Sequence, residues 1–221
     1  ASTRGVEIHQ HTEVKSLLRD KDGTIKGVET NRGTVLANKV AVVVSGHTTT
    51  ITETAGLRLP IKSFNLAAFV SEPVKPLIDV IVNCPDLGVY LNQSDKGELV
   101  IGGAPDPGQS FRRDVKQNVF EEAVVTMLEL FPAFRRLKLL RQWGGVLDIA
   151  HDATPIISAT DISGLFVSCG WWGGFKAVPA GGYTLAHLIA TGQPHNVAAP
   201  FTLDRFHHLD FIVESGTTTA R

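Results

Sequence analysis

The residues best suited to chemistry in this 221-residue sequence lie in the stretch VSCGWWGGFKAVPAGG, residues 167–182. Five glycines, two adjacent tryptophans and one cation, Lys176, follow an apolar segment and precede a segment with helical character. Glycine lets a backbone approach a flat ring without a Cβ in the way, and a helix N-terminus carries a partial positive charge. We therefore expect this turn to lie against a ring that becomes anionic on reduction, with a helix beginning near Pro179.

The same pattern has a purely structural alternative. A strand, a glycine-rich turn and a helix often mean only that a helix packs closely on a sheet, and the pattern alone favours that interpretation. Trp171 and Trp172 would then be core aromatics, and Lys176 would be a solvated surface residue. The residues alone leave both interpretations open.

His9, His11 and the two cysteines suggest no further chemistry. His9 and His11 share one face of a predicted strand, but no carboxylate or cysteine cluster with ligand spacing accompanies them, so we expect no metal site. Cys84 and Cys169 are too few for a disulfide framework and are expected to be inert thiols in a reducing, cytoplasmic setting. No nucleophile-elbow pattern supports a Ser/His/Asp hydrolase.

Composition and charge argue against two classes of partner. The formal net charge is −1, which gives no electrostatic reason to expect nucleic acid or an anionic membrane. The longest apolar run, VAVVV at residues 40–44, is far shorter than the roughly 20 residues that span a bilayer. Hydrophobic residues make up 43% and charged residues 19%, as in a globular protein with ample material for a buried core.

Strands at both ends of the chain must position the glycine turn. Residues 5–46 predict a three-stranded meander, because glycine after Asp or Arg supplies the positive φ that tight turns need. Residues 40–44 and 165–169 are apolar on both faces, which is typical of strands in a parallel sheet that is covered on both sides. Short helical segments are expected over residues 51–60 and, before a stop at Gly192, after the glycine turn.

The middle of the chain predicts a β-rich segment with one long helix. Residues 61–112 contain frequent turns and a predicted hairpin of VYLNQ and ELVIGG. In the helix that follows, Asp114 is a candidate N-cap, Gln117 completes a capping box and Pro132 ends the helix. Its apolar positions repeat at helical spacing and predict packing on a sheet; they are Val115, Val119, Ala123, Met127 and Leu130.

The stretch RQWGGVLDIAHDATPIIS, followed by GLFVSCGWWGGFKAVPAGG, resembles the flavin-dependent amine oxidases of the D-amino-acid-oxidase type. Within that family the chain is most similar to the β subunits of heterotetrameric sarcosine oxidases. Supporting stretches occur in order along nearly the whole chain, which makes the resemblance specific. They are AGLRLPI (55–61), VSEPVKP (70–76), QSDKGELVIG (93–102), ELFPAFRRL (129–137) and APFTLDRF (199–206).

The resemblance implies an α/β (α+β) fold class. An incomplete FAD/NAD(P)-binding Rossmann-like domain would carry an inserted, mostly antiparallel substrate domain. Residues 1–60 would be the remainder of the FAD-binding domain and residues 61–155 the substrate or interface domain. Residues 156–221 would return to the FAD-binding domain and end in a tail.

The resemblance also implies roles for individual residues. Val14 would place its backbone against the FAD adenine. Gly46, with Ser45 and His47, would lie near the FAD phosphates or ribose. Lys176 would hold the carboxylate of an amino-acid substrate, so that its Cα–N or N-methyl bond faces the flavin. The residues expected beside the isoalloxazine ring are Gly170, Trp172, Gly173, Gly174, Phe175 and Lys176.

The resemblance implies a structural role for residues 148–152. Asp148 and Asp152 flank His151, an arrangement that suggests acid–base chemistry. In the resemblance this stretch is instead a turn before the strand TPII, and hydride transfer to a flavin needs no such pair of groups.

The sequence departs from the family pattern in the turn and in what precedes it. The glycine motif usually reads C-G-W-G-T-G-G-F-K, whereas this chain has CGWWGGFK, one residue shorter and with Trp172 in the turn. The G-x-G-x-x-G turn that holds the FAD pyrophosphate and the histidine that carries covalent FMN would both precede residue 1. We therefore expect this chain to be the C-terminal part of a subunit. Alone, it should be inactive and should bind FAD weakly.

These observations predict flavin-dependent oxidative demethylation of sarcosine, or of a related N-methyl or secondary amino acid, by hydride transfer to FAD. The chain would act in a cytoplasmic hetero-oligomer with a larger α subunit and smaller subunits. Electrons would pass to FMN, and the α subunit would receive the one-carbon unit on tetrahydrofolate. The alternatives are a flavin dehydrogenase for proline- or glycine-like amino acids and a non-catalytic assembly fragment.

Overall fold

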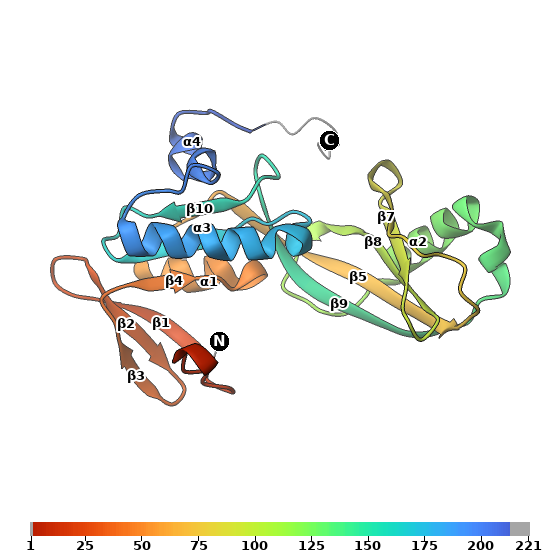
Figure 1. Cartoon of the computed structure of the whole chain (residues 1–221), viewed down its shortest axis with the longest axis horizontal. Helices are drawn as coiled ribbons and strands as arrows, with labels where there is room; N and C mark the ends of the chain where they lie inside the picture. The colour runs from red at the N-terminus through yellow and green to blue at the C-terminus, as the bar shows by residue number, and fades with distance from the viewer. Residues whose placement is uncertain (1, 213–221) are drawn as a thin grey trace.

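Two short turns fold the N-terminal segment into an antiparallel ribbon, in which β1 (Val14–Arg19) pairs with β2 (Ile25–Thr30) and β2 with β3 (Gly33–Leu36). The computed structural model describes residues 2–212 (Figure 1). The carboxylate of Asp20 closes the first turn by accepting a hydrogen bond from the backbone N–H of Thr24 at 2.8 Å. The predicted meander is confirmed, although its first strand begins at Val14 and not at residue 5.

A second sheet joins segments from both ends of the chain. Its strands are β4 (Val40–Val42), β10 (Ile156–Ala159) and β11 (Leu165–Cys169). β11 lies in the middle, parallel to β4 and antiparallel to β10, and all its residues are buried, as predicted. The expectation of burial on both faces is wrong for residues 40–44. Val43 and Val44 are 56% and 47% exposed, because they follow the last paired residue of β4 and face solvent.

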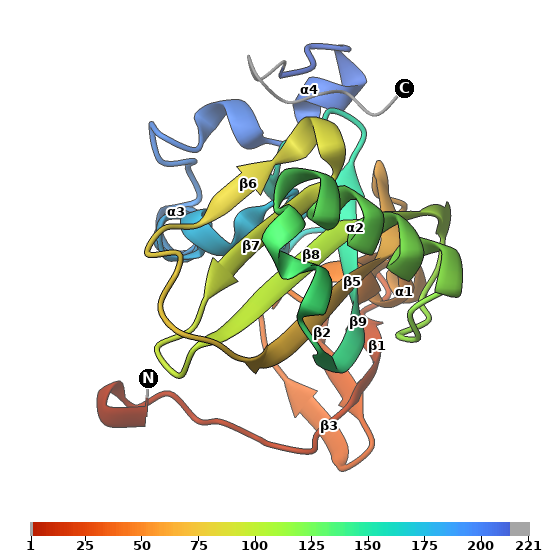
Figure 2. The same cartoon turned by 90° about the vertical axis from the view of Figure 1, so that its right-hand side faces the viewer.

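The middle of the chain forms a five-stranded antiparallel sheet in the order β6-β7-β8-β5-β9 (Figure 2). Its strands are β5 (Ile61–Pro73), β6 (Val82–Cys84), β7 (Val89–Gln93), β8 (Glu98–Gln109) and β9 (Leu139–Ala150). The predicted hairpin is β7 and β8. α2 (Gln117–Leu130) packs on this sheet through Val119, Ala123 and Met127, which confirms the predicted apolar stripe.

The start of α2 differs from the sequence prediction. Its N-cap is Lys116, which makes no side-chain capping bond. Asp114, the predicted cap, instead accepts two hydrogen bonds from the guanidinium of Arg112, at 2.7 and 2.6 Å. This bidentate, charge-assisted pair occupies the carboxylate that a capping box would need. The helix ends before Pro132, as predicted.

β5 and β9 belong to two hydrophobic cores at once. Ile61 at the start of β5 and Ala150 at the end of β9 pack in a core with Val42 and Val167. Further along β5, Phe69 belongs to the core beneath α2. Figure 1 shows these two strands passing from one lobe of the elongated molecule to the other. The two lobes therefore share a continuous antiparallel ladder.

The helix after the glycine turn packs on the second sheet. α3 (Val178–Thr191) has Pro179 in its first turn and ends at Gly192, whose φ is 75°, as the sequence predicts. Leu185 and Leu188 belong to the core that this helix forms with the sheet. The indole of Trp171 packs beside the same core and occupies the space next to Gly181.

Two short helices complete the described chain. α1 (Thr48–Thr52) continues as a 3-10 turn that ends at Gly56, so the helix predicted over residues 51–60 lies earlier in the sequence. α4 (Asp204–His207) follows a 3-10 turn at Ala199–Phe201. Within residues 2–212, no helix is both long enough and apolar enough to cross a membrane.

A buried ion pair fastens α4 to the turn after β9. The guanidinium of Arg205 donates to both carboxylate oxygens of Asp152, at 2.7 and 3.0 Å, and these side chains are 4% and 2% exposed. Arg205 also donates to the carbonyls of Thr154 and Thr202. Burial alone raises the pKa of Asp152, but the hydrogen bonds and charge of Arg205 outweigh it and hold that pKa below its usual value.

The stability that Asp152 contributes should be lost in acid. Because its folded-state pKa is lowered, the contribution is present above the unfolded pKa of about 3.9 and is lost as the pH falls through the folded value. We expect Asp152→Ala to lower the free energy of unfolding by about 3 kcal/mol at neutral pH, because a buried guanidinium is left uncompensated. Urea unfolding measured from neutral pH downward should show this difference shrinking below about pH 4. A difference that stays constant across this range would contradict the ion-pair assignment.

Alanine substitutions at the two adjacent glycines of α3 should change the free energy of unfolding in opposite directions. A Cβ on Gly181 would lie 2.6 Å from the Trp171 ring, whereas one on Gly182 would meet nothing within 4 Å. We expect Gly181→Ala to lower the free energy of unfolding by about 1–3 kcal/mol, because the added methyl group overpacks the contact with Trp171. Gly182→Ala, the matched control, should stabilise by up to about 1 kcal/mol because alanine is the better helix former. Denaturant unfolding followed by tryptophan fluorescence measures both, and equal effects would show that Trp171 does not pack there.

Candidate functional site

Two turns meet at one edge of the second sheet because β4 and β11 are parallel neighbours. Ligands of open α/β sheets bind where the carboxyl ends of such strands emerge. The turn after β4 contains Ser45–His47, and the turn after β11 contains residues 170–177. Figure 1 shows the N-terminal end of α3, which follows the second turn, facing the other lobe. The structure thus brings together two of the segments that the sequence placed near a flavin.

A buried carboxylate on β9 bridges the two turns. Asp148 is 0% exposed, and one of its oxygens accepts a hydrogen bond from the N–H of Gly170 at 2.8 Å. Its other oxygen accepts one from the hydroxyl of Ser45 at 3.3 Å. Gly46 in the first turn is so close to β9 that a Cβ would lie 2.3 Å from the Val146 side chain. Close packing on β9 therefore requires glycine at position 46.

The glycines of the second turn serve different purposes. A Cβ on Gly174 would lie 2.7 Å from the Trp171 side chain, and one on Gly170 would lie 2.8 Å from the Cβ of Ala150. Gly173, whose φ is 64°, has nothing within 4 Å of its Cβ position. Close packing therefore explains Gly170 and Gly174, as the structural alternative proposes. Gly173 has left-handed backbone, which favours glycine, and its backbone is open to a ligand.

The side chains around Gly173 form an exposed surface. Trp172 is 40% exposed and Phe175 is 92% exposed, whereas Trp171 is partly buried against α3. Lys176 is exposed, and none of the ion pairs found among residues 2–212 includes it. Trp171 is thus a core aromatic, but Trp172 is not. An unpaired cation beside two exposed rings is available to a ligand that has a flat ring and an anionic group.

Val14 lies in a different sheet from the two turns. It begins β1 and pairs with Thr30 in the N-terminal ribbon. β1 contacts α1, the helix that follows the turn Ser45–His47. The adenine contact of Val14 stays a prediction, as do the ring contacts assigned to the second turn.

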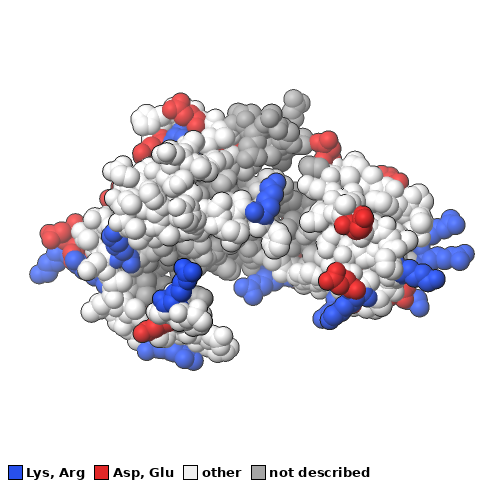
Figure 3. Space-filling model, in the orientation of Figure 1, with Lys and Arg blue, Asp and Glu red and all other residues white. Residues whose placement is uncertain are grey.

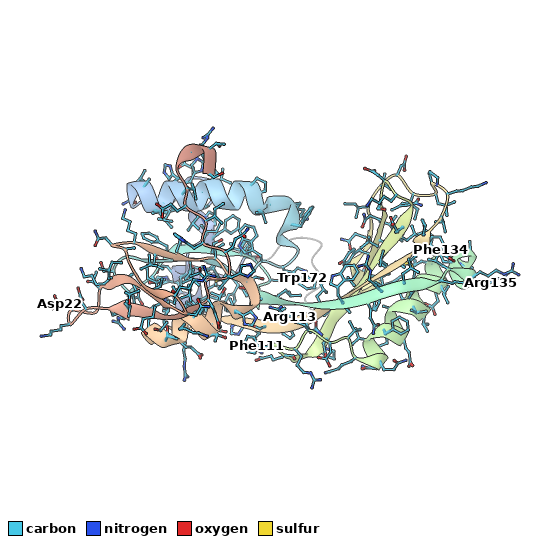
Figure 4. The ribbon with its side chains drawn as sticks, turned by 90° about the horizontal axis from the view of Figure 1, so that it is seen from below. Asp22, Phe111, Arg113, Phe134, Arg135 and Trp172 are labelled. Atoms are coloured by element: carbon cyan, nitrogen blue, oxygen red, sulfur yellow. The ribbon has the colours of Figure 1, made fainter. Side chains whose placement is uncertain are left out.

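The structure adds an aromatic and a cationic residue that the sequence did not single out. Phe111 and Arg113 follow β8 and lie at the junction of the two lobes (Figure 4). The ring of Phe111 is 5.4 Å from the ring of His47 in the first turn, with an interplanar angle of 23°. The carbonyl of Arg113 accepts a hydrogen bond from the N–H of Gly144 on β9. No local pattern in the sequence predicts this stacking, since it depends on packing of the large sheet against the first turn.

Other reactive groups lie outside this surface. Burial, reinforced by the negative charge of Asp148, raises the pKa of the Cys169 thiol far above its usual value, so the thiol stays protonated at neutral pH. No group of three or more His, Cys, Asp or Glu side chains in the described part of the chain is arranged to hold a metal ion. Figure 3 shows Lys and Arg side chains interspersed with Asp and Glu along one face of the molecule. That face has no continuous basic stripe of the kind that follows a nucleic-acid backbone.

The described residues fit the ring end of a flavin dinucleotide. The open backbone at Gly173, the exposed rings of Trp172 and Phe175 and the cation of Lys176 suit a flat ring and its anionic neighbour. The pyrophosphate of such a cofactor needs a G-x-G-x-x-G turn, and residues 1–221 contain none. The fit is therefore to one end of the cofactor.

Proteins of known identity match this chain over nearly its whole length. The sarcosine oxidase subunit beta of Rhodobacter capsulatus is 46% identical over 215 residues, which is 97% of this chain and 51% of the relative. The protein of the same name from Arthrobacter sp is 44% identical over 217 residues, or 98% and 53% of the two chains. The chain thus spans about half the length of the curated relatives it matches. The predicted resemblance to sarcosine oxidase β subunits is confirmed.

Solved structures share the fold. L-proline dehydrogenase from P. horikoshii superposes with a TM-score of 0.86 at 26% identity, covering 94% of this chain and 57% of that one. Glycine oxidase from Geobacillus kaustophilus superposes with a TM-score of 0.81 at 23% identity, covering 92% and 55%. The predicted α/β (α+β) fold class, with a Rossmann-like part and antiparallel sheets, is confirmed. A family model described as DAO, FAD dependent oxidoreductase, matches residues 1–188. The parallel strand pair, the glycine turn and these matches together show that the chain belongs to the DAO family of FAD dependent oxidoreductases.

Proposed function

We propose that the complete polypeptide containing this chain oxidises sarcosine, or a related N-methyl or secondary amino acid, by hydride transfer to FAD. The observation that carries this proposal is the cation of Lys176, which forms no ion pair within residues 2–212, beside the open backbone of Gly173. It occurs in a chain that is 46% identical to a sarcosine oxidase subunit beta over 97% of its length. The chemistry of the turn and the identity of the relatives support the same substrate class.

In this proposal the two parts of the chain hold different reactants. Residues 1–60 and 156–221 contribute β4, β11 and α3 to the side that holds FAD. Residues 61–155 contribute the five-stranded sheet to the side that holds the substrate. The two turns lie where these parts meet, which is where a substrate must lie to reach the flavin.

Lys176 is assigned the role of orienting the substrate. Its ammonium group donates charge-assisted hydrogen bonds to the substrate carboxylate, which directs the Cα–N or N-methyl bond toward the ring. Gly173 allows the backbone to approach the ring plane, and the N-terminus of α3 adds a partial positive charge beside it. FAD, when bound, supplies the acceptor for the hydride. The imine that leaves is hydrolysed by water, and O2 is the final oxidant.

The complete enzyme is proposed to be a cytoplasmic hetero-oligomer. The name of the relatives, subunit beta, describes proteins with further subunits. A larger α subunit would take up electrons through FMN and the one-carbon unit on tetrahydrofolate, and smaller subunits would complete the assembly. Copurification of the full-length protein with these partners tests this part of the proposal.

Two other functions have a specific observation in their favour. The superposition on L-proline dehydrogenase at a TM-score of 0.86 favours a flavin dehydrogenase for proline- or glycine-like substrates. The shortened turn with Trp172 favours an assembly role without catalysis. Flavin absorbance of the purified full-length protein separates the enzymes from the assembly role. Turnover of sarcosine against proline, followed as peroxide or dye reduction, separates the two enzymes.

Replacement of Lys176 should weaken substrate binding without unfolding the protein. We expect Lys176→Ala, in the complete polypeptide, to raise the KM for sarcosine by about 10- to 100-fold, because a hydrogen bond to a charged group contributes roughly 1.5–3 kcal/mol. Circular dichroism should be unchanged, since the side chain is exposed. Lys176→Arg keeps a cation and should give a smaller increase. Lys21→Ala, at an exposed turn of the N-terminal ribbon, is the control and should keep the wild-type KM. An unchanged KM in Lys176→Ala would refute the assigned role.

A further inference from the structure

Ser63 and Asp148 form a buried polar pair on adjacent strands of the large sheet. They are direct partners in the β5–β9 register and are 5% and 0% exposed. The hydroxyl of Ser63 donates to the carbonyl of Gly46 at 2.6 Å. Asp148 accepts hydrogen bonds from the hydroxyl of Ser45 at 3.3 Å and from the N–H of Gly170 at 2.8 Å. These three bonds all lead from the sheet to the two turns.

Burying a carboxylate at position 148 costs free energy. A buried carboxylate loses its hydration, and only hydrogen bonds or a cation can offset that loss. None of the ion pairs among the described residues includes Asp148, whereas Asp152 has Arg205. Its charge acts at the end of β11, since it adds to burial in raising the pKa of Cys169, the residue before Gly170. An apolar side chain at this position of β9 would avoid that free-energy cost. The carboxylate is therefore useful for the two groups that it binds, the hydroxyl of Ser45 and the N–H of Gly170.

Both turns have left-handed backbone at the residue that donates to Asp148. Ser45 has a φ of 50°, which is unusual for a residue with a Cβ, and Gly170 has a φ of 70°. A non-glycine residue keeps such a conformation only where its surroundings enforce it. The hydroxyl of Thr48 reinforces the first turn by donating to the carbonyl of Ser45 at 2.6 Å. The two oxygens of Asp148 therefore fix both turn conformations and the spacing between them.

We propose that Asp148 is a positioning residue for the cofactor, which locks the turn Ser45–His47 to residues 170–177 so that both contact one FAD molecule. This inference rests on the proposed function. Asp148 acts through the backbone of Gly170 and the hydroxyl of Ser45, and does not itself touch the flavin. Loss of these two hydrogen bonds leaves the strands paired but lets the two turns move independently. FAD affinity and the environment of the flavin ring should then change more than the fold does.

The test is FAD binding by the Asp148→Asn variant of the complete polypeptide. An amide has one carbonyl oxygen and cannot accept from both donors in the same way as the carboxylate. Titration of the apoprotein with FAD should give a dissociation constant raised by about tenfold or more, with a changed visible flavin spectrum. The apoprotein should still unfold cooperatively. Asp152→Asn, the same change at another buried carboxylate, is the matched control and should lower the unfolding temperature with the FAD dissociation constant unchanged.

A second variant keeps the inference testable if Asp148→Asn does not fold. Ser45→Ala removes one of the two hydrogen bonds and retains the carboxylate, and it should raise the FAD dissociation constant by roughly threefold. A folded Asp148→Asn protein, or in its absence Ser45→Ala, that binds FAD with wild-type affinity and spectrum overturns the positioning role alone. A wild-type protein that binds no FAD overturns the proposed function and this inference with it.

Discussion

The candidate site depends on the parallel pairing of β4 with β11. Residues 40–42 and 165–167 are direct neighbours in this pair, although most of the chain lies between them. Because the two strands run in the same direction, the turns that follow them emerge at the same edge of the sheet. α3 leaves from that edge and packs back over the sheet, which places its N-terminal end at the junction of the lobes (Figure 1). The meeting of the two turns is thus a consequence of strand direction.

The antiparallel ladder of β5 and β9 connects that edge to the second lobe. Its residues contribute to both hydrophobic cores, so the large sheet is anchored at the end nearest the turns. The polar partners Ser63 and Asp148 occur at this end, and Phe69 lies further along in the apolar core beneath α2. A single strand pair therefore packs in both hydrophobic cores and, at the end nearest the turns, also supplies hydrogen bonds to them.

The glycine turn combines two constraints that the sequence pattern cannot separate. Gly174 and Gly181 make room for the Trp171 ring, which packs beside α3. Gly173 has no neighbour at its Cβ position and leaves an open stretch of backbone beside Lys176. Both types of glycine look alike in the sequence, because a missing side chain serves protein packing and ligand approach equally well. The position of one indole ring distinguishes them.

Local sequence determined much of the fold, because turns, caps and hydrophobic periodicity act over a few residues. Pro179 and Gly192 predicted the limits of α3, and hydrophobic patterns predicted the apolar stripe of α2 and the burial of β11. It also carried the family resemblance, which rests on motifs along the whole chain. The positions of partners that are distant in the sequence depended on tertiary packing.

Two differences from the sequence prediction depend on which groups come into contact. They are the hydrogen bonds from Arg112 to Asp114 and the exposure of Val43 beyond the paired part of β4. The same holds for Asp148, which the sequence placed either in an acid–base group with His151 or in a turn, and which the structure places on β9. Its hydrogen bonds to Ser45 and Gly170 join three segments that are separate in the chain. Such contacts exist only after the strands have paired, so no window of neighbouring residues encodes them.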